Sequence, residues 1–133
     1  KYKNIANLLF NYFYAEVFGT YRCEGINSLG KGYIDIDLER ATVPGHVTNV
    51  RQISITPTQV RFLVGADLYN GGMVIKKIYV EYFNAQDPAD RNIKEFPYSP
   101  NFENPIIIDN LRPSTFYTFR FSAENEVGKG WLM

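Results

Sequence analysis

The sequence has very few of the residues on which most catalytic and metal sites depend. Its 133 residues include one histidine, His46, and one cysteine, Cys23. A zinc site with several histidines, or a catalytic triad that uses histidine, therefore cannot be built within this chain. We predict no catalytic residue, no cofactor-binding residue and no metal ligand, and we expect the protein not to be an enzyme.

Long apolar runs and an excess of charge are also missing. The apolar runs, of which Ile106-Ile107-Ile108 is one, fall far short of the roughly 20 residues that a membrane-spanning helix needs. The 14 basic residues balance the 14 acidic residues. No overall field would attract a polyanion or an anionic membrane surface, so we expect no nucleic-acid partner.

What the chain does contain is aromatic residues, turn residues and alternation with a period of two. Aromatic residues make up 16% of the chain, which also has 10 glycines and 7 prolines, as is typical of short strands separated by turns. The segment from Tyr33 to Glu39 places three apolar residues on one face and three acidic residues on the other, which predicts a half-buried strand. Residues 60–64, 78–82 and 117–123 alternate as well. The fold class is predicted to be all-β.

Two motifs resemble the corners of two different β-sandwich modules. Tyr21-Arg-Cys23, with the turn and the alternating strand that follow it, resembles the last strands of an immunoglobulin domain. The run from Leu111 through Pro113 and Thr115 to Tyr117 resembles the corner of a fibronectin type III domain. The chain is therefore similar to an Ig-like β-sandwich remnant followed by a fibronectin type III β-sandwich.

This resemblance implies the domain boundaries. Residues 1–40 would hold only the C-terminal strands E, F and G of an immunoglobulin domain, because a Tyr-x-Cys strand is the sixth of about seven. Residues 41–45, with Pro44 and Gly45, would form a linker. Residues 46–133 would be a fibronectin type III domain whose last strand is truncated. The chain is accordingly expected to be a fragment of a larger protein.

The resemblance also implies structural roles for individual residues. Tyr21 and Tyr117 would be corner tyrosines, and the Tyr117 hydroxyl would bond to a buried backbone group. Cys23 would form a disulfide bond in the larger protein with a cysteine that lies outside this chain. The shared parity of the strands adds a predicted core, formed by Phe62, Ile78, Val80, Leu111, Tyr117, Phe119 and Phe121.

The order of the two modules resembles that of cell-adhesion molecules, most of all the neural cell adhesion molecule and fasciclin II group. This likeness implies an extracellular module at the cell surface, in a parent protein anchored in the plasma membrane, with a role in neural development. It would act as a spacer and by homophilic or heterophilic binding to cell-surface proteins, either the same or a related adhesion molecule. Two alternatives stay open: a module of an intracellular giant muscle filament protein, and the ectodomain of a receptor phosphatase or kinase.

Two segments are candidates for the binding interface. Residues 96–105 interleave aromatic residues with proline and would present Tyr98 and Phe102, although these rings could instead cover the core of their own sandwich. The junction between the two modules adds Glu39, Arg40 and Pro44.

The acidic face of the strand at residues 33–39 leaves two further readings open. Asp35, Asp37 and Glu39 could share a calcium ion as hard oxygen ligands. A solvated strand face, compensated by nearby basic residues, would have the same sequence.

Overall fold

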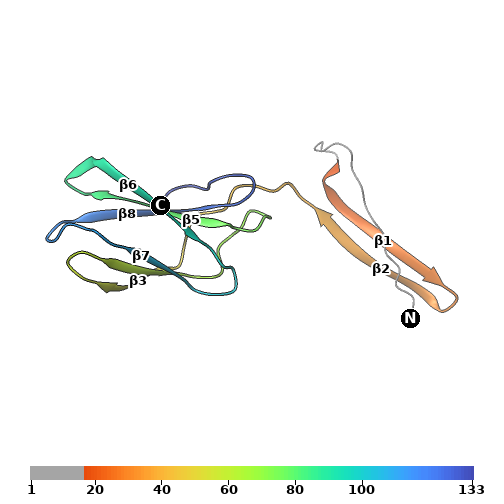
Figure 1. The fold of residues 1–133 in the computed structure, drawn as a ribbon. Helices are drawn as coiled ribbons and strands as arrows, with labels where there is room; N and C mark the ends of the chain where they lie inside the picture. Colours follow the sequence, from red (N-terminus) through yellow and green to blue (C-terminus); the bar gives the residue numbers. More distant parts are fainter. Residues whose placement is uncertain (1–16) are drawn as a thin grey trace. The chain divides into compact units, whose positions relative to one another are not determined.

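The computed structural model describes residues 17–133 and divides the chain into two compact units, Lys1–Arg40 and Ala41–Met133. The regular elements of the described part are eight β-strands (Figure 1), which confirms the predicted all-β fold class. No helix in residues 17–133 has the length and apolar character needed to cross a bilayer.

The first unit contains an antiparallel hairpin. Strand β1 (Gly19–Asn27) pairs with β2 (Gly30–Leu38), and this register places Tyr21 opposite Ile36 and Cys23 opposite Ile34. The Asn27 side chain shapes the turn, because its Oδ1 atom accepts hydrogen bonds from Leu29 N (2.8 Å) and Gly30 N (3.1 Å). The strand predicted for residues 33–39 is confirmed for residues 33–38, which belong to β2, whereas Glu39 follows the end of the strand.

The predicted burial of one face of this strand is wrong. Ile34 and Ile36, expected to be covered, are 62% and 48% exposed. The physical reason is that the strands described in this unit, β1 and β2, form a single two-stranded sheet, and a sheet face is buried only where a second layer packs against it.

The second unit is a sandwich of two three-stranded antiparallel sheets (Figure 1). One sheet has the order β3 (Val50–Ile55), β4 (Val60–Val64) and β7 (Asn104–Ile108). The other has the order β6 (Asp87–Pro97), β5 (Lys77–Asn84) and β8 (Tyr117–Glu124). Residues after β8 continue the second sheet, since Phe121 N donates to Met133 O and Met133 N donates to Phe121 O.

The core lies between the two sheets and matches the predicted set. Ile78 and Val80 are 0% exposed and Phe62 and Phe121 are each 7% exposed, while the other three predicted residues are partly buried against this cluster. The rings of Phe62 and Phe121 meet edge to face, with centroids 5.3 Å apart, a favoured aromatic geometry. The inward parity read from the sequence is confirmed.

Residues 41–45, predicted to be a linker, are hydrogen-bonded into the second unit. Thr42 N donates to Gly71 O (2.8 Å), and Gly45 N donates to Tyr69 O (3.1 Å). Gly71 has φ +68°, and a Cβ atom there would lie 2.2 Å from Thr42 O, so this contact requires glycine. The start of the unit is therefore built into its loops.

Asn125 joins three segments at this end of the sandwich. Its Nδ2 atom donates to Thr42 O (2.7 Å) and to Asn70 O (2.8 Å), and its Oδ1 atom accepts from Val127 N (2.9 Å) and Gly128 N (3.2 Å). The residue is 3% exposed, and this set uses all the usual hydrogen-bonding capacity of its amide. A single buried side chain thus fixes residues 41–45 against two loops.

Candidate recognition surfaces

The loop between β6 and β7 is held in shape by a buried asparagine. Asn104, 6% exposed, accepts a hydrogen bond from Ser99 N (2.7 Å) through Oδ1. Its Nδ2 atom donates to Ser99 O (3.0 Å) and to Phe102 O (2.9 Å). The side chain therefore joins the two ends of the loop, and residues 98–103, which we call the aromatic loop, are fixed from inside.

Tyr98 anchors the start of the aromatic loop. Its hydroxyl donates to Ala66 O (2.7 Å) and lies 3.3 Å from Gly65 O, and its ring packs against the core. Burial raises the pKa of the Tyr98 phenol because the charged form loses hydration. Of the two readings left open for this residue, cover for its own core is the one that its contacts support.

Phe102 has the opposite environment. It is 70% exposed, at the tip of the loop that Asn104 holds. Beside it, Glu103 forms an exposed ion pair with Arg51, with 2.6 Å between Nη2 and Oε1. An aromatic ring held in the solvent on an ordered loop is a suitable anchor for a protein interface, since little conformational freedom is lost when it is buried by a partner.

The junction residues predicted for the interface also differ from one another in exposure. Glu39 and Arg40 are exposed at the end of the first unit. Pro44 is fully buried, and its carbonyl oxygen lies so close to Gly130 that a Cβ atom there would be 2.4 Å away. The predicted interface role of Pro44 is not compatible with this packing, because the residue belongs to the interior of the second unit.

Both corner tyrosines bond to the backbone, but the partner of Tyr117 is not the buried group that was expected. The Tyr21 hydroxyl donates to Val17 O (2.5 Å). The Tyr117 hydroxyl accepts from Arg112 N (2.9 Å), which is an exposed rather than a buried backbone group. Cys23 is exposed and is a free thiol in the described part of the chain, so its disulfide with a cysteine outside this chain stays a prediction.

The acidic face of β2 is engaged by neighbours on β1. Asp35 accepts from Arg22 at 2.8 and 3.1 Å, and Asp37 accepts from Thr20 at 2.6 Å. Within residues 17–133, no group of three or more acidic, histidine or cysteine side chains is placed to hold a metal ion. These contacts support a solvated strand face over a calcium site.

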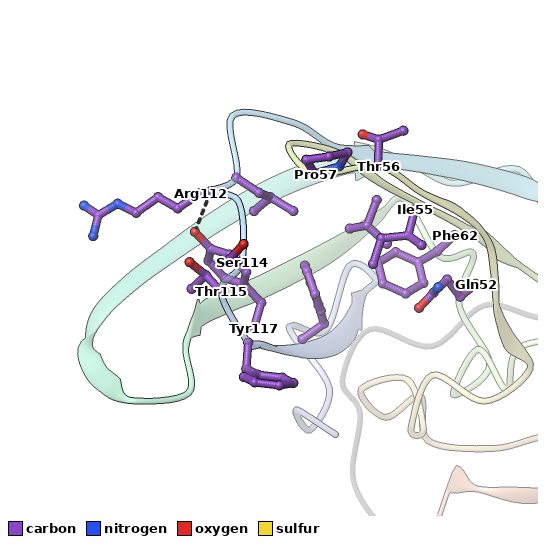
Figure 2. Close-up of a pocket in the computed structure, with 13 residues that line it drawn as sticks. Gln52, Ile55, Thr56, Pro57, Phe62, Arg112, Ser114, Thr115 and Tyr117 are labelled. Atoms are coloured by element: carbon purple, nitrogen blue, oxygen red, sulfur yellow. Dashed lines mark hydrogen bonds between the residues drawn. The ribbon is translucent and has the colours of Figure 1, made fainter.

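A groove that the sequence did not indicate lies between β3, β4 and β8 (Figure 2). It has a volume of about 630 Å³, and its lining includes the apolar side chains of Phe62, Leu111 and Phe119. Ile55 and Phe116, at 70% and 78% exposed, also contribute to its lining. The Arg112 side chain points away from it (Figure 2). Alternation could not predict this groove, because it depends on how far apart the sheets lie at this edge.

The relatives of the chain are adhesion proteins. It is 34% identical over 119 residues to "Fasciclin-2" of Schistocerca americana, and 29% identical over 113 residues to "Cell adhesion molecule DSCAM" of Gallus gallus. These matches cover 89% and 84% of this chain, which spans only 13% and 5% of the two relatives. No family model matches the chain.

Solved structures support the fold. The chicken CNTN1 FN1–FN3 domains match with a TM-score of 0.52 and 21% identity, over 86% of this chain and 38% of that one. The third fibronectin III domain of human KIAA0343 matches with a TM-score of 0.55 and 18% identity, over 68% of this chain and 78% of that one. Since the adhesion molecules named above are non-enzymatic, the expectation that the chain is not an enzyme is confirmed. The chain is homologous to a short segment of the immunoglobulin and fibronectin type III adhesion molecules to which Fasciclin-2 and DSCAM belong.

Proposed function

We propose that the chain is an extracellular recognition module of a neural-type adhesion molecule, and that it binds cell-surface proteins through the aromatic loop. The observation that carries this proposal is the exposed Phe102 ring on a loop fixed by Asn104. The adhesion relatives support an adhesion module rather than a muscle filament module or the ectodomain of a receptor enzyme. The partner is the same protein or a related adhesion molecule, and the sandwich also serves as a spacer.

The loop is already ordered, so little further ordering is needed when a partner binds. Asn104 and Tyr98 already fix the backbone of residues 98–103 through hydrogen bonds of 2.7 to 3.0 Å. A partner that covers Phe102 would gain the burial of a large apolar ring at a small cost in conformational entropy. The exposed pair of Arg51 and Glu103 would lie at the polar rim of such an interface.

The charge of the chain is consistent with recognition by local surfaces. Its 14 basic and 14 acidic residues cancel, so long-range attraction contributes little to the encounter and specificity depends on the residues that touch. The extracellular location and the membrane anchor of the parent protein belong to this proposal, as does the disulfide at Cys23.

The test is a binding assay with the full chain on beads and cells that display the same chain or Fasciclin-2-type relatives. We expect Phe102→Ala to weaken binding by about tenfold or more, as expected for a central aromatic anchor. Phe116→Ala is the matched control, because Phe116 is also a highly exposed phenylalanine of the second unit, 78% exposed. The Phe116→Ala variant should bind as the parent chain does.

Asn104→Ala tests the positioning of the ring. This variant keeps Phe102 but removes the three hydrogen bonds that fix the loop, so binding should weaken while circular dichroism still reports a folded sandwich. Unchanged binding by Phe102→Ala, or no binding of the parent chain to any of these cells, would refute the proposal.

A further inference from the structure

The outer face of the sheet β6-β5-β8 carries charged side chains around one phenylalanine ring. This Phe83 cluster consists of Glu81, Phe83, Arg91 and Arg120. Because Ile78, Val80 and Tyr82 face the core, β5 directs Glu81 and Phe83 to the opposite face. The register places Arg91 opposite Phe83 and Arg120 opposite Glu81, so the four residues meet on one surface.

Both arginines are held against the ring and are still accessible. The Cζ atoms of Arg91 and Arg120 lie 5.0 and 5.4 Å from the centroid of the Phe83 ring, within the range of cation–π attraction. Their side chains are 47% and 43% exposed, whereas Phe83 is buried at 6%. The ring therefore orders two guanidinium groups at the surface.

Glu81 offers these two cations only one carboxylate. Its side chain is 9% exposed, and Oε1 accepts from Arg91 Nη1 at 3.2 Å. Oε2 lies 3.7 Å from Arg120 Nη1, too far for a hydrogen bond, and has no hydrogen-bond partner among the described residues. No hydrogen bond within residues 17–133 engages the Arg120 guanidinium. The cluster keeps one positive charge and a planar set of free donors.

The other cations on this face have contacts outside the Phe83 cluster. Lys77 pairs with Glu95 at 3.2 Å. The Lys129 ammonium lies 3.4 Å from the centroid of the Tyr79 ring, and the Tyr79 hydroxyl donates to Glu124. The face is therefore not generally basic, which disfavours a polyanion such as a sulfated glycan, since a polyanion needs several free cations. A single carboxylate matches the one free charge and the fork of a guanidinium.

We propose that the Phe83 cluster is a binding site for an aspartate or glutamate side chain of a partner protein, which Arg120 holds with the support of Arg91. The site depends on the proposed function only in that the partner is a protein, and it lies on a different element from the aromatic loop. Charge complementarity selects the partner: an acidic segment supplies the second carboxylate that the two arginines lack.

The experiment uses the full chain labelled with ¹⁵N and a synthetic peptide in which glutamate alternates with threonine. The side-chain Nε–Hε signals of Arg91 and Arg120 should shift in a saturable manner as the peptide is added, while that of Arg61 should not. Arg61 is an exposed arginine of the other sheet, and its Nε donates a hydrogen bond to Gln59 Oε1 (3.1 Å). The matched variants are therefore Arg120→Gln and Arg61→Gln, of which only the first should weaken binding, by about tenfold.

Two further variants separate recognition from damage to the fold. Glu81→Gln removes the competing carboxylate and should strengthen peptide binding several-fold. Misfolding would weaken binding, so stronger binding cannot result from damage to the fold. Phe102→Ala should leave peptide binding unchanged, so that failure of the aromatic loop and failure of this site are distinguishable.

Three results would overturn the proposal: no shift of the two arginine signals with millimolar peptide, equal weakening by the Arg61 and Arg120 variants, or tighter binding of a heparin-derived oligosaccharide than of the peptide. The last result would assign the face to a sulfated glycan.

Discussion

The hairpin of the first unit and the sandwich of the second have the same strand pattern but opposite exposure. In β2, Ile34 and Ile36 alternate with aspartates and are 62% and 48% exposed. In β5, Ile78 and Val80 alternate with polar residues and are 0% exposed. Alternation thus determines which side chains share a face, whereas burial requires a second sheet at a packing distance.

The stabilising contacts differ accordingly. Among the described residues of the first unit, the hairpin has its backbone ladder, the turn at Asn27 and the exposed pair of Arg22 and Asp35, and exposed ion pairs contribute little. The sandwich combines a closed apolar core with the buried, hydrogen-bonded amides of Asn104 and Asn125. Substitutions of the same type in the two units therefore test whether burial is the source of the difference.

The largest effect is expected from removing an isoleucine side chain in each unit. Ile106→Ala, at a position that is 0% exposed, should lower the free energy of unfolding by about 3 kcal/mol because it leaves a cavity. Ile34→Ala, at a position that is 62% exposed, should change the free energy of unfolding by less than about 0.5 kcal/mol. Urea denaturation followed by circular dichroism measures both, and equal losses would contradict the comparison.

A smaller loss should follow from removing a buried amide. Asn125→Ala deletes four hydrogen bonds and leaves Thr42 O and Asn70 O without this donor. We expect a loss of about 2 kcal/mol, in the range found for buried polar groups left unpaired. Asn27→Ala is the matched change in the exposed turn of the hairpin, and it should cost distinctly less. Faster amide exchange at Thr42, whose N–H donates to Gly71 O, would locate the damage.

The corner tyrosines allow a conservative comparison. Tyr117→Phe removes the bond from Arg112 N and keeps the ring, so the second unit should lose about 1 kcal/mol, because the exposed amide can bond to water instead. Tyr21→Phe removes the bond to Val17 O in the other unit and should leave the thermal unfolding of the second unit unchanged. A loss above about 3 kcal/mol for Tyr117→Phe would show that Arg112 N becomes buried without its partner.

The smallest effect concerns a single proton. The hydrogen bond to Glu124 raises the pKa of Tyr79 to about 12, from 10.0. Because the folded pKa is the higher one, the contribution of this group to stability is complete below pH 10 and is lost as the pH rises through about 12. Ultraviolet titration should resolve a phenol that titrates near pH 12 and that Tyr79→Phe removes. A parent chain in which every tyrosine titrates near pH 10 would contradict this assignment.

The sequence predicted the parts of the fold that depend on local pattern. Alternation located strands such as β5 and β8, and the Leu-Pro-Thr-Tyr run located the corner at Tyr117. The sequence could not predict that residues 41–45 form hydrogen bonds within the second unit, because the acceptors Tyr69 and Gly71 are distant in sequence. The burial of Pro44 has the same cause.

The candidate surfaces were predicted less completely. Aromatic and proline residues indicated the loop that carries Phe102, but composition could not separate the exposed Phe102 from the anchored Tyr98, since both are aromatic residues of one loop. The outward parity of Arg120 was readable. Its meeting with Arg91 over Phe83 depends on the pairing of three strands, which a single sequence does not supply.

The hydrogen bonds at Thr42, Gly45 and Asn125 have a mechanical consequence. A tensile load applied to the second unit through residue 40 would first act on the bonds from Thr42 N to Gly71 O, from Gly45 N to Tyr69 O and from Asn125 Nδ2 to Thr42 O. These bonds lie ahead of β3 along the chain, so they would have to rupture before the load reached the ladder between β3 and β4.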